Sequence, residues 1–182
     1  TADDAKGNRQ EKNQIVLDAE TTTVAKDGKL DVKNTLTLEK NLTVQGIVNA
    51  AATDVKAKDV AVNIEASEAD ANKYAGSASL GKVTVGAGTA QDANSLTVSV
   101  AEGASAQADS LDIAAEVKDK DGSTTKNTAG KFVLASGKFN AGTLTNGGSV
   151  SIGDSGAATL TVSGTSVNKG GVTFDNNNAS AL

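Results

Sequence analysis

Histidine, cysteine, methionine, proline and tryptophan are absent from this 182-residue sequence, which contains three phenylalanines and a single tyrosine, Tyr74. Without histidine or cysteine, the chain cannot use imidazole or thiolate catalysis, form disulfides, or bind zinc and haem through their usual ligands. The scarcity of aromatic rings disfavours sites that stack on sugars or nucleic-acid bases. The remaining reactive groups are carboxylates, amines, guanidinium groups, hydroxyls and one phenol.

The charge and the apolar content set further limits. The formal net charge of −5 opposes nucleic-acid binding, which needs clustered Lys and Arg. No apolar run approaches the roughly 18 residues that a membrane-spanning helix needs, so no membrane span is expected. Because the chain starts at Thr1 and has no methionine, we expect a processed product, with which secretion is consistent. Val, Leu, Ile and Phe together number 38, which predicts a thin core.

Alternation of apolar and polar residues is the main structural signal. From residue 29 to 45 every odd position is polar, while most even positions up to Val48 carry Leu or Val. This period of two is typical of half-buried β-strands. The interruptions at Asn34 and Lys40 allow two interpretations. One is a solenoid that stacks six-residue units beginning at Leu30, Leu36 and Leu42, and the other is a pair of ordinary strands joined at 40–41.

Similar i, i+2 pairs recur to Phe174, separated by Gly-rich turns such as Asp27–Gly28, Asn146–Gly148 and Lys169–Gly171. Many short strands with such turns predict an all-β fold, a Gly/Thr-rich β-sandwich with a β-solenoid as the alternative. We expect one β-rich domain over residues 15–175. A second interpretation divides it into two small subdomains near 118–130.

Three segments depart from the strand pattern. Ser67–Ala75 is expected to form one short helix or a helical loop, because Ser67 can cap a helix and acidic residues occupy the first turn. Residues 1–14 contain no large apolar side chain and are expected to form a flexible N-terminal arm, which plain disorder or ordering on a neighbouring subunit would both explain. Residues 176–182 are expected to form a polar tail.

Candidate sites are few. Asp119 and Asp121 precede Gly122 as at the start of a calcium loop, but the twelfth position, which should be acidic, is Gly130. A solvated hairpin is the competing interpretation, so calcium is the sole candidate ligand and no cofactor is expected. Serine and threonine hydroxyls have no histidine to activate them as nucleophiles. The sequence also does not single out a pair of acids for glycoside hydrolysis. We therefore expect no catalytic residues and no enzyme activity.

Two stretches, Leu36–Val48 and Ala141–Phe174, resemble the Gly-, Thr-, Asn- and Val-rich strand repeats of bacterial surface proteins, which include autotransporter passengers, surface-layer or filament subunits and the outer domains of flagellins. The resemblance lies in composition and strand pattern. It implies an exported, extracellular or cell-surface protein that builds a filament, a lattice or an adhesive surface.

A thin β-domain gains stability when its sheet edges pair with neighbours, so the first functional expectation is a structural subunit that self-associates with copies of itself. An adhesin or passenger domain that binds a host or neighbouring-cell surface is the alternative, and a phage tail-fibre or virion surface component is the second alternative. Lysines on the polar faces, such as Lys29 and Lys33, argue partly against edge pairing, because edge lysines help monomers resist strand addition.

Overall fold

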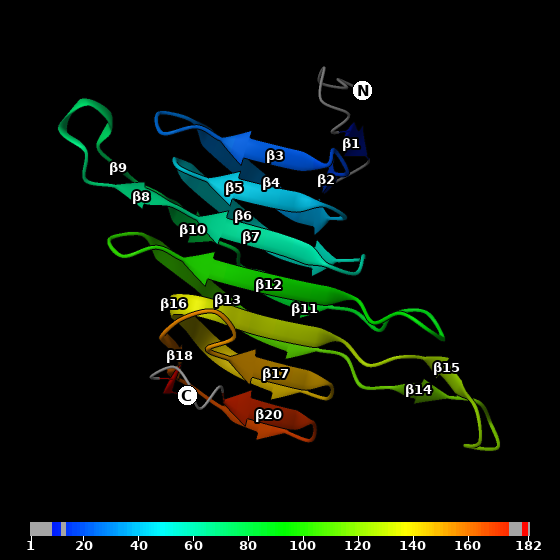
Figure 1. Ribbon diagram of the computed structural model, residues 1–182. Coiled ribbons are helices and arrows are strands. Elements are labelled where there is room, and N and C mark those ends of the chain that lie inside the picture. The colour runs from blue at the N-terminus through cyan, green and yellow to red at the C-terminus, as the bar shows by residue number, and fades with distance from the viewer. Residues whose placement is uncertain (1–8, 12–13, 175–179, 182) are drawn as a thin grey trace.

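The computed structural model describes residues 9–11, 14–174 and 180–181, and almost every regular element in this part of the chain is a β-strand. The all-β prediction is confirmed. The chain winds so that its strands alternate between two facing sheets, sheet A and sheet B, and each turn of the winding, here called a coil, adds to both sheets (Figure 1). Sheet B faces the viewer in Figure 1 and sheet A lies behind it.

The strands of each sheet are listed here in order along the stack. Sheet A contains β1 (Arg9–Glu11), β2 (Gln14–Leu17), β4 (Lys29–Leu38), β6 (Ile47–Val55), β10 (Ser77–Ser79) with β11 (Lys82–Val85), β13 (Ser105–Ile113), the second part of β16 (Lys131–Asn146), β18 (Ala158–Val162) with β19 (Ser166–Asn168), and β21 (Ser180–Ala181). Sheet B contains β3 (Thr21–Val24), β5 (Asn41–Val44), β7 (Val60–Ile64), β12 (Ser95–Val100), the first part of β16, β17 (Ser149–Ile152) and β20 (Gly171–Phe174). Two small hairpins lie outside the stack, β8 (Ala66–Ser67) with β9 (Tyr74–Ala75), and β14 (Val117–Lys118) with β15 (Thr125–Asn127).

Neighbouring strands within each sheet are parallel, except that β1 pairs antiparallel with β2. Each coil returns to a sheet in the same direction, which is why its strand joins the previous one in parallel. The two layers face each other as in a sandwich, and the parallel stacking of successive coils is that of a solenoid. β16 joins the layers directly, since it bends at Gly137, where φ is +82°, and continues from sheet B into sheet A.

The coils differ in length. One inward-facing row of sheet B joins Thr22, Leu42, Val62, Val98, Leu134, Ile152 and Phe174, so consecutive coils span 20, 20, 36, 36, 18 and 22 residues. The two long coils carry the extra residues at their corners, in the β8–β9 hairpin, in the loop 86–94 and in the segment 114–130 that contains β14 and β15. Insertions at corners leave the paired strands undisturbed.

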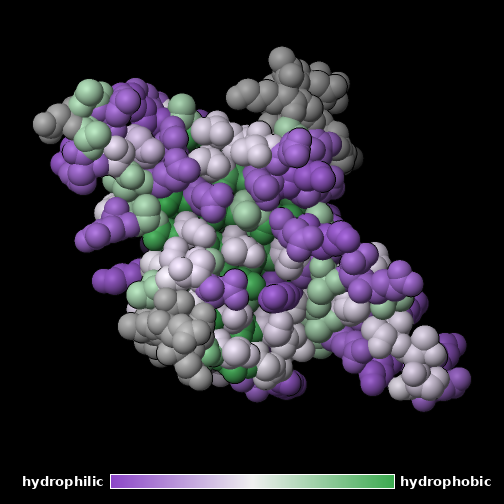
Figure 2. Space-filling model, in the orientation of Figure 1, coloured by the Kyte–Doolittle hydropathy of each residue, from purple (hydrophilic) through white to green (hydrophobic). Residues whose placement is uncertain are grey.

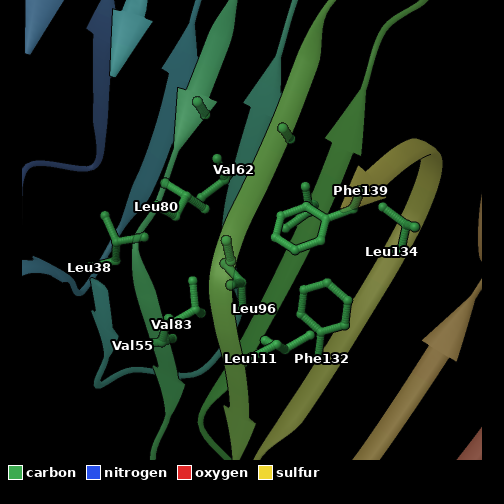
Figure 3. Close-up of a cluster of buried hydrophobic side chains, with 14 of the residues drawn as sticks. Leu38, Val55, Val62, Leu80, Val83, Leu96, Leu111, Phe132, Leu134 and Phe139 are labelled. Carbon is green, nitrogen blue, oxygen red and sulfur yellow. The ribbon is translucent and has the colours of Figure 1, made fainter. Parts of the chain in front are cut away.

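The core is a single column of aliphatic side chains between the sheets, running from Leu17 to Leu160 and including residues on both sides of the 118–130 stretch. Figure 3 shows its middle part, where Leu96, Leu111 and Leu134 point into the space between the strands. Phe132 and Phe139, from the two parts of β16, are fully buried, with ring centroids 5.6 Å apart and planes tilted by 57°. Two large rings therefore fill the place where β16 crosses between the sheets.

Glycines stack at the corner where sheet A leads into sheet B. Gly130, Gly148 and Gly170 precede β16, β17 and β20, and the N–H groups of Ser149 and Gly171 donate to the carbonyls of Gly130 and Gly148 at 3.1 and 2.9 Å. A Cβ at Gly148 or Gly170 would collide with the carbonyl oxygen of the preceding glycine in the stack. The Gly-rich turns of the sequence are therefore required by the close approach of successive coils.

The stacking of six-residue units is wrong. Leu30 and Leu36 lie in the same strand, β4, whereas Leu42 lies in β5 of the other sheet. Leu30, Leu36 and Leu42 instead pair with Val48, Thr53 and Val62 of the next coil. The alternative break near Lys40 is correct, because β4 ends at Leu38 and β5 begins at Asn41. A bulge in β4 between Val32 and Thr35 accounts for the polar Asn34 in the apolar phase.

The expectation of one short helix at 67–75 is also wrong, and of the alternative, a helical loop, one 3-10 turn is present. The segment is the β8–β9 hairpin, closed by a three-residue 3-10 turn, Asp70–Asn72. Its N-cap is Ala69, and the Ser67 hydroxyl accepts the N–H of Ala69 at 3.3 Å without capping a helix.

Most of the expected N-terminal arm, residues 1–14, and of the expected C-terminal tail, residues 176–182, lies outside the described residues. In the described parts of the arm and the tail, β1 pairs with β2, and β21 pairs with β18.

Candidate functional site

The calcium candidates lie on an arm at the corner between sheet A and sheet B. The arm consists of residues 86–94 and 114–130, and it extends to the lower right in Figure 1 through β14 and β15. Backbone hydrogen bonds join its two parts, since Gly88 N–H donates to the Thr128 carbonyl at 2.9 Å and Thr128 N–H donates to the Thr89 carbonyl at 2.8 Å. The Asn127 amide adds a bond to the Gly88 carbonyl at 2.6 Å. The arm is thus anchored at its base.

At the tip of this arm, Asp119 closes its own turn. Its Oδ1 accepts the N–H of Ser123 at 3.0 Å, and its backbone N–H donates to the Thr124 carbonyl at 2.9 Å. Asp121 is exposed on the same turn. Within the described residues, no three acidic side chains gather in the way a metal ion would need. The structure therefore places Asp119 and Asp121 on a hairpin, with Asp119 in a turn-forming role.

Two carboxyls of the described residues, Asp31 and Asp119, have lowered pKa values. Hydrogen bonds from the Lys29 ammonium, at 2.8 Å, and the Asn49 amide, at 2.9 Å, lower the pKa of Asp31 below its ordinary 3.8. For Asp119, desolvation acts to raise the pKa, but hydrogen bonds from Thr124 and Ser123 together outweigh it, so the pKa is lowered. Both carboxylates therefore accept hydrogen bonds in their charged form.

These shifts predict how stability depends on pH. A carboxyl whose folded pKa lies below its unfolded value contributes stability above the unfolded value, and loses that contribution as pH falls through the folded pKa. We expect urea midpoints that are constant from about pH 8 to 5 and fall below about pH 4. The double variant Asp31→Asn/Asp119→Asn should show a shallower decline than the wild type. Unchanged steepness would contradict the assignment, and Asp121→Asn is the control.

A hollow of about 740 Å³ opens at the opposite corner, where sheet B leads into sheet A. It lies between the turn after β12 and the bend of β16, because the β16 coil turns this corner without a loop. The charged side chains that line it are Glu102 and Lys138. A pair of carboxyls for glycoside hydrolysis is not assembled by these lining residues.

A polar side chain is buried at the glycine corner. Asn146 is 1% exposed and occupies an inward row that contains Leu38, Val85 and Ile113 in earlier coils. Its amide donates to Asn168 Oδ1 at 2.8 Å and to the Gly171 carbonyl at 3.1 Å, while its Oδ1 accepts the N–H of Gly148 at 3.1 Å. These three bonds satisfy the buried amide, and the two to Asn168 and Gly171 join its coil to the next one.

The outer surface of sheet B carries little charge. Its outward-facing residues in the central strands are small and uncharged, and Lys131 is the sole charged residue within the strands of sheet B as described. In Figure 2, white and green predominate over the middle of this face, and purple gathers towards its two sides. The ionisable groups of the described chain therefore lie mainly on sheet A and at the corners. The neutral residues of sheet B include Thr43, Ala61, Asn63, Thr97 and Ser99.

The outermost strands of sheet B have a free edge. β3 pairs with β5 and β20 pairs with β17, and neither has a second partner among the described residues. The carbonyl of Val24 accepts the N–H groups of Gln45 and Gly46, so it points to the β5 side. In a parallel strand the backbone groups of successive residues point to opposite sides, so those of Thr23 point to the open side. In this strand order, sheet B presents β3 at one end and β20 at the other (Figure 1).

Comparison with known proteins does not assign this chain to a family. No protein-family model, no curated protein and no solved structure matches this chain. Across residues 9–11, 14–174 and 180–181, no helix has the length and apolar character to cross a membrane.

The position of β3 and β20 at the two ends of sheet B is not predictable from the sequence, because the alternation of apolar and polar residues reveals strands but not their order in a sheet.

Proposed function

We propose that this chain is a non-catalytic structural subunit of an extracellular surface assembly, a filament or a surface layer, and that it self-associates through β-strand edges. The observation that supports this is that, among the described residues, the outermost strands of sheet B, β3 and β20, each pair with a strand on one side only. All strands of sheet B run in the same direction, so β20 of one copy and β3 of another can pair in parallel without any change of fold. Such a contact joins different surfaces and therefore repeats from copy to copy.

Exposed apolar side chains at the β20 end support the same contact. Among the described residues, four large hydrophobic side chains are strongly exposed, and two of them, Val167 and Phe174, lie in the last coil, each 41% exposed. Phe174 continues the inward row of Leu134 and Ile152, so a strand added beside β20 would cover its ring. Burial of this ring and pairing of the edge would act together.

Thr23→Pro is the variant that tests this proposal. Proline removes the N–H that Thr23 directs to the open edge and leaves the β3–β5 pairing intact, so it should block strand addition. We expect wild-type protein to form particles larger than a monomer in sedimentation and elongated or sheet-like assemblies by negative-stain microscopy, with Thr23→Pro remaining monomeric. Thr23→Ala is the matched control and should assemble. A wild type that stays monomeric at high concentration overturns the proposal.

A further inference from the structure

The outer face of sheet A carries a line of polar side chains that runs along the stack. The residues occupy equivalent positions in successive strands, and each pairs in register with the next. We call this line the polar row. With about 4.8 Å between neighbouring strands, its six members extend over about 24 Å. The polar row consists of Asp31, Asn49, Ser79, Gln107, Asn140 and Thr161.

Sheet A bends immediately after the polar row, and the bend makes the surface concave. β10 and β11 are separated at Leu80–Gly81, where Gly81 has a φ of +59°, and β18 and β19 are separated at 163–165. Two hollows lie along the bend. One, of about 250 Å³, includes Asp31 and Asn49, and the other, of about 390 Å³, includes Gln107, Asn140 and Thr161. The polar row therefore connects two shallow hollows by way of Ser79, which lines neither, and we call the two hollows and the row between them the groove.

We propose that this groove binds a linear, uncharged polysaccharide in an extended conformation. The polysaccharide chain would lie parallel to the axis along which the coils stack. Amide side chains both donate and accept hydrogen bonds, so Asn49, Gln107 and Asn140 can pair with sugar hydroxyls of either orientation. A polymer of repeating hydroxyl groups matches a row of repeating amides and hydroxyls.

The charges near the groove favour a neutral ligand. The hollows contain Asp31, Lys33 and Asp109, which are of mixed sign, and the chain as a whole carries a net charge of −5. A polyanion would need a basic groove, and a polycation an acidic one. An extended peptide is recognised through backbone pairing at a sheet edge, whereas the four inner members of the polar row, from Asn49 to Asn140, are already paired with a strand on each side. The groove contains no aromatic ring, so binding relies on hydrogen bonds and should be weak for each sugar unit.

Affinity gel electrophoresis tests this proposal with three soluble neutral polysaccharides, hydroxyethyl cellulose, arabinoxylan and galactomannan, and with polygalacturonate as the charged comparison. We expect retardation of the wild type in at least one neutral gel. The double variant Gln107→Ala/Asn140→Ala should bind about tenfold more weakly, because two amide partners are lost. The matched control Thr84→Ala/Thr145→Ala changes two exposed positions of sheet A beyond the bend and should bind as the wild type does.

The outcomes that overturn the proposal are retardation in none of the neutral gels, retardation in polygalacturonate alone, and equal weakening in the two double variants. Circular dichroism and thermal unfolding of both variants should match the wild type, since all four side chains are replaced on the surface. The groove lies away from the edges of sheet B. The monomeric Thr23→Pro variant should therefore bind the same polysaccharide, which separates this proposal from the proposed self-association.

Discussion

Replacing Phe139 with alanine is expected to lower the free energy of unfolding by about 4 kcal/mol, the largest effect among the single substitutions considered. The Phe139 ring is completely buried and contacts Phe132 at the bend of β16, so its removal leaves a cavity between two strands that belong to different sheets. A domain of this size has a total stability of roughly 5 to 15 kcal/mol, so the variant should unfold at a much lower urea concentration.

Phe174→Ala is the matched control, because the same side chain is lost from a position that is 41% exposed. Its effect should stay below about 1 kcal/mol when both variants are made in the monomeric Thr23→Pro background. Equal destabilisation by Phe139→Ala and Phe174→Ala would contradict the placement of Phe139 in the core. The measurement is equilibrium urea unfolding followed by far-ultraviolet circular dichroism.

Replacing Gly148 with alanine is expected to cost about 3 kcal/mol. Its Cβ would collide with the carbonyl oxygen of Gly130 and lie 2.9 Å from that of Ala114. These oxygens accept hydrogen bonds from Ser149 and Gly130, so neither can move away without breaking the pairing between coils. Thermal unfolding should show a midpoint lowered by several degrees.

Gly171→Ala is the comparison for this substitution. Gly171 lies in the next coil of the same corner, but nothing lies within 4 Å of a Cβ placed there. We expect its midpoint to lie close to that of the wild type. If Gly148→Ala were equally well tolerated, the close approach of coils at the glycine corner would be refuted.

The strands themselves were predictable from local patterns. The alternation through Leu36, Leu38, Leu42 and Val44 identified buried positions correctly, because each strand of the stack presents one face to the core. The Gly-rich turns at 146–148 and 169–171 marked real corners. Strand alternation and Gly-rich turns each depend on a few residues that are neighbours in the sequence, so they can be predicted from the sequence alone.

The register between coils was not predictable. The polar row joins Asn49 to Ser79 and Gln107 to Asn140, pairs that are 30 and 33 residues apart, whereas Asp31 and Asn49 are 18 apart. Insertions of different lengths at the corners erase any constant period, so the stacking of these side chains depends on tertiary pairing alone. The same reason explains why the six-residue units beginning at Leu30, Leu36 and Leu42 do not stack on one another, since the unit that stacks is a whole coil.

The segment Ser67–Ala75 shows how a local preference is overridden. Its capping residue and early acids favour a helix start, yet Ala66 and Ala75 pair antiparallel and close a hairpin between two strands of the stack. The six residues between the inner pair of the hairpin, Ser67 and Tyr74, leave space for a single 3-10 turn. At the calcium-like spacing, Asp119 Oδ1 accepts the N–H of Ser123 within a hairpin turn, and calcium binding by Asp119 and Asp121 stays a prediction.

Because every pairing in the stack joins adjacent coils, cooperativity should spread from neighbour to neighbour rather than across the whole domain. Within the described part of the chain, each central strand of sheet B pairs on both sides, whereas β3 and β20 pair on one side. Amide hydrogen exchange should therefore be slowest in β7, β12 and β13 and faster towards both ends of the column. Under tension along its axis, such a protein would lose one coil at a time from its ends and recover the coils in the reverse order, because each coil re-forms on a neighbour that is still folded.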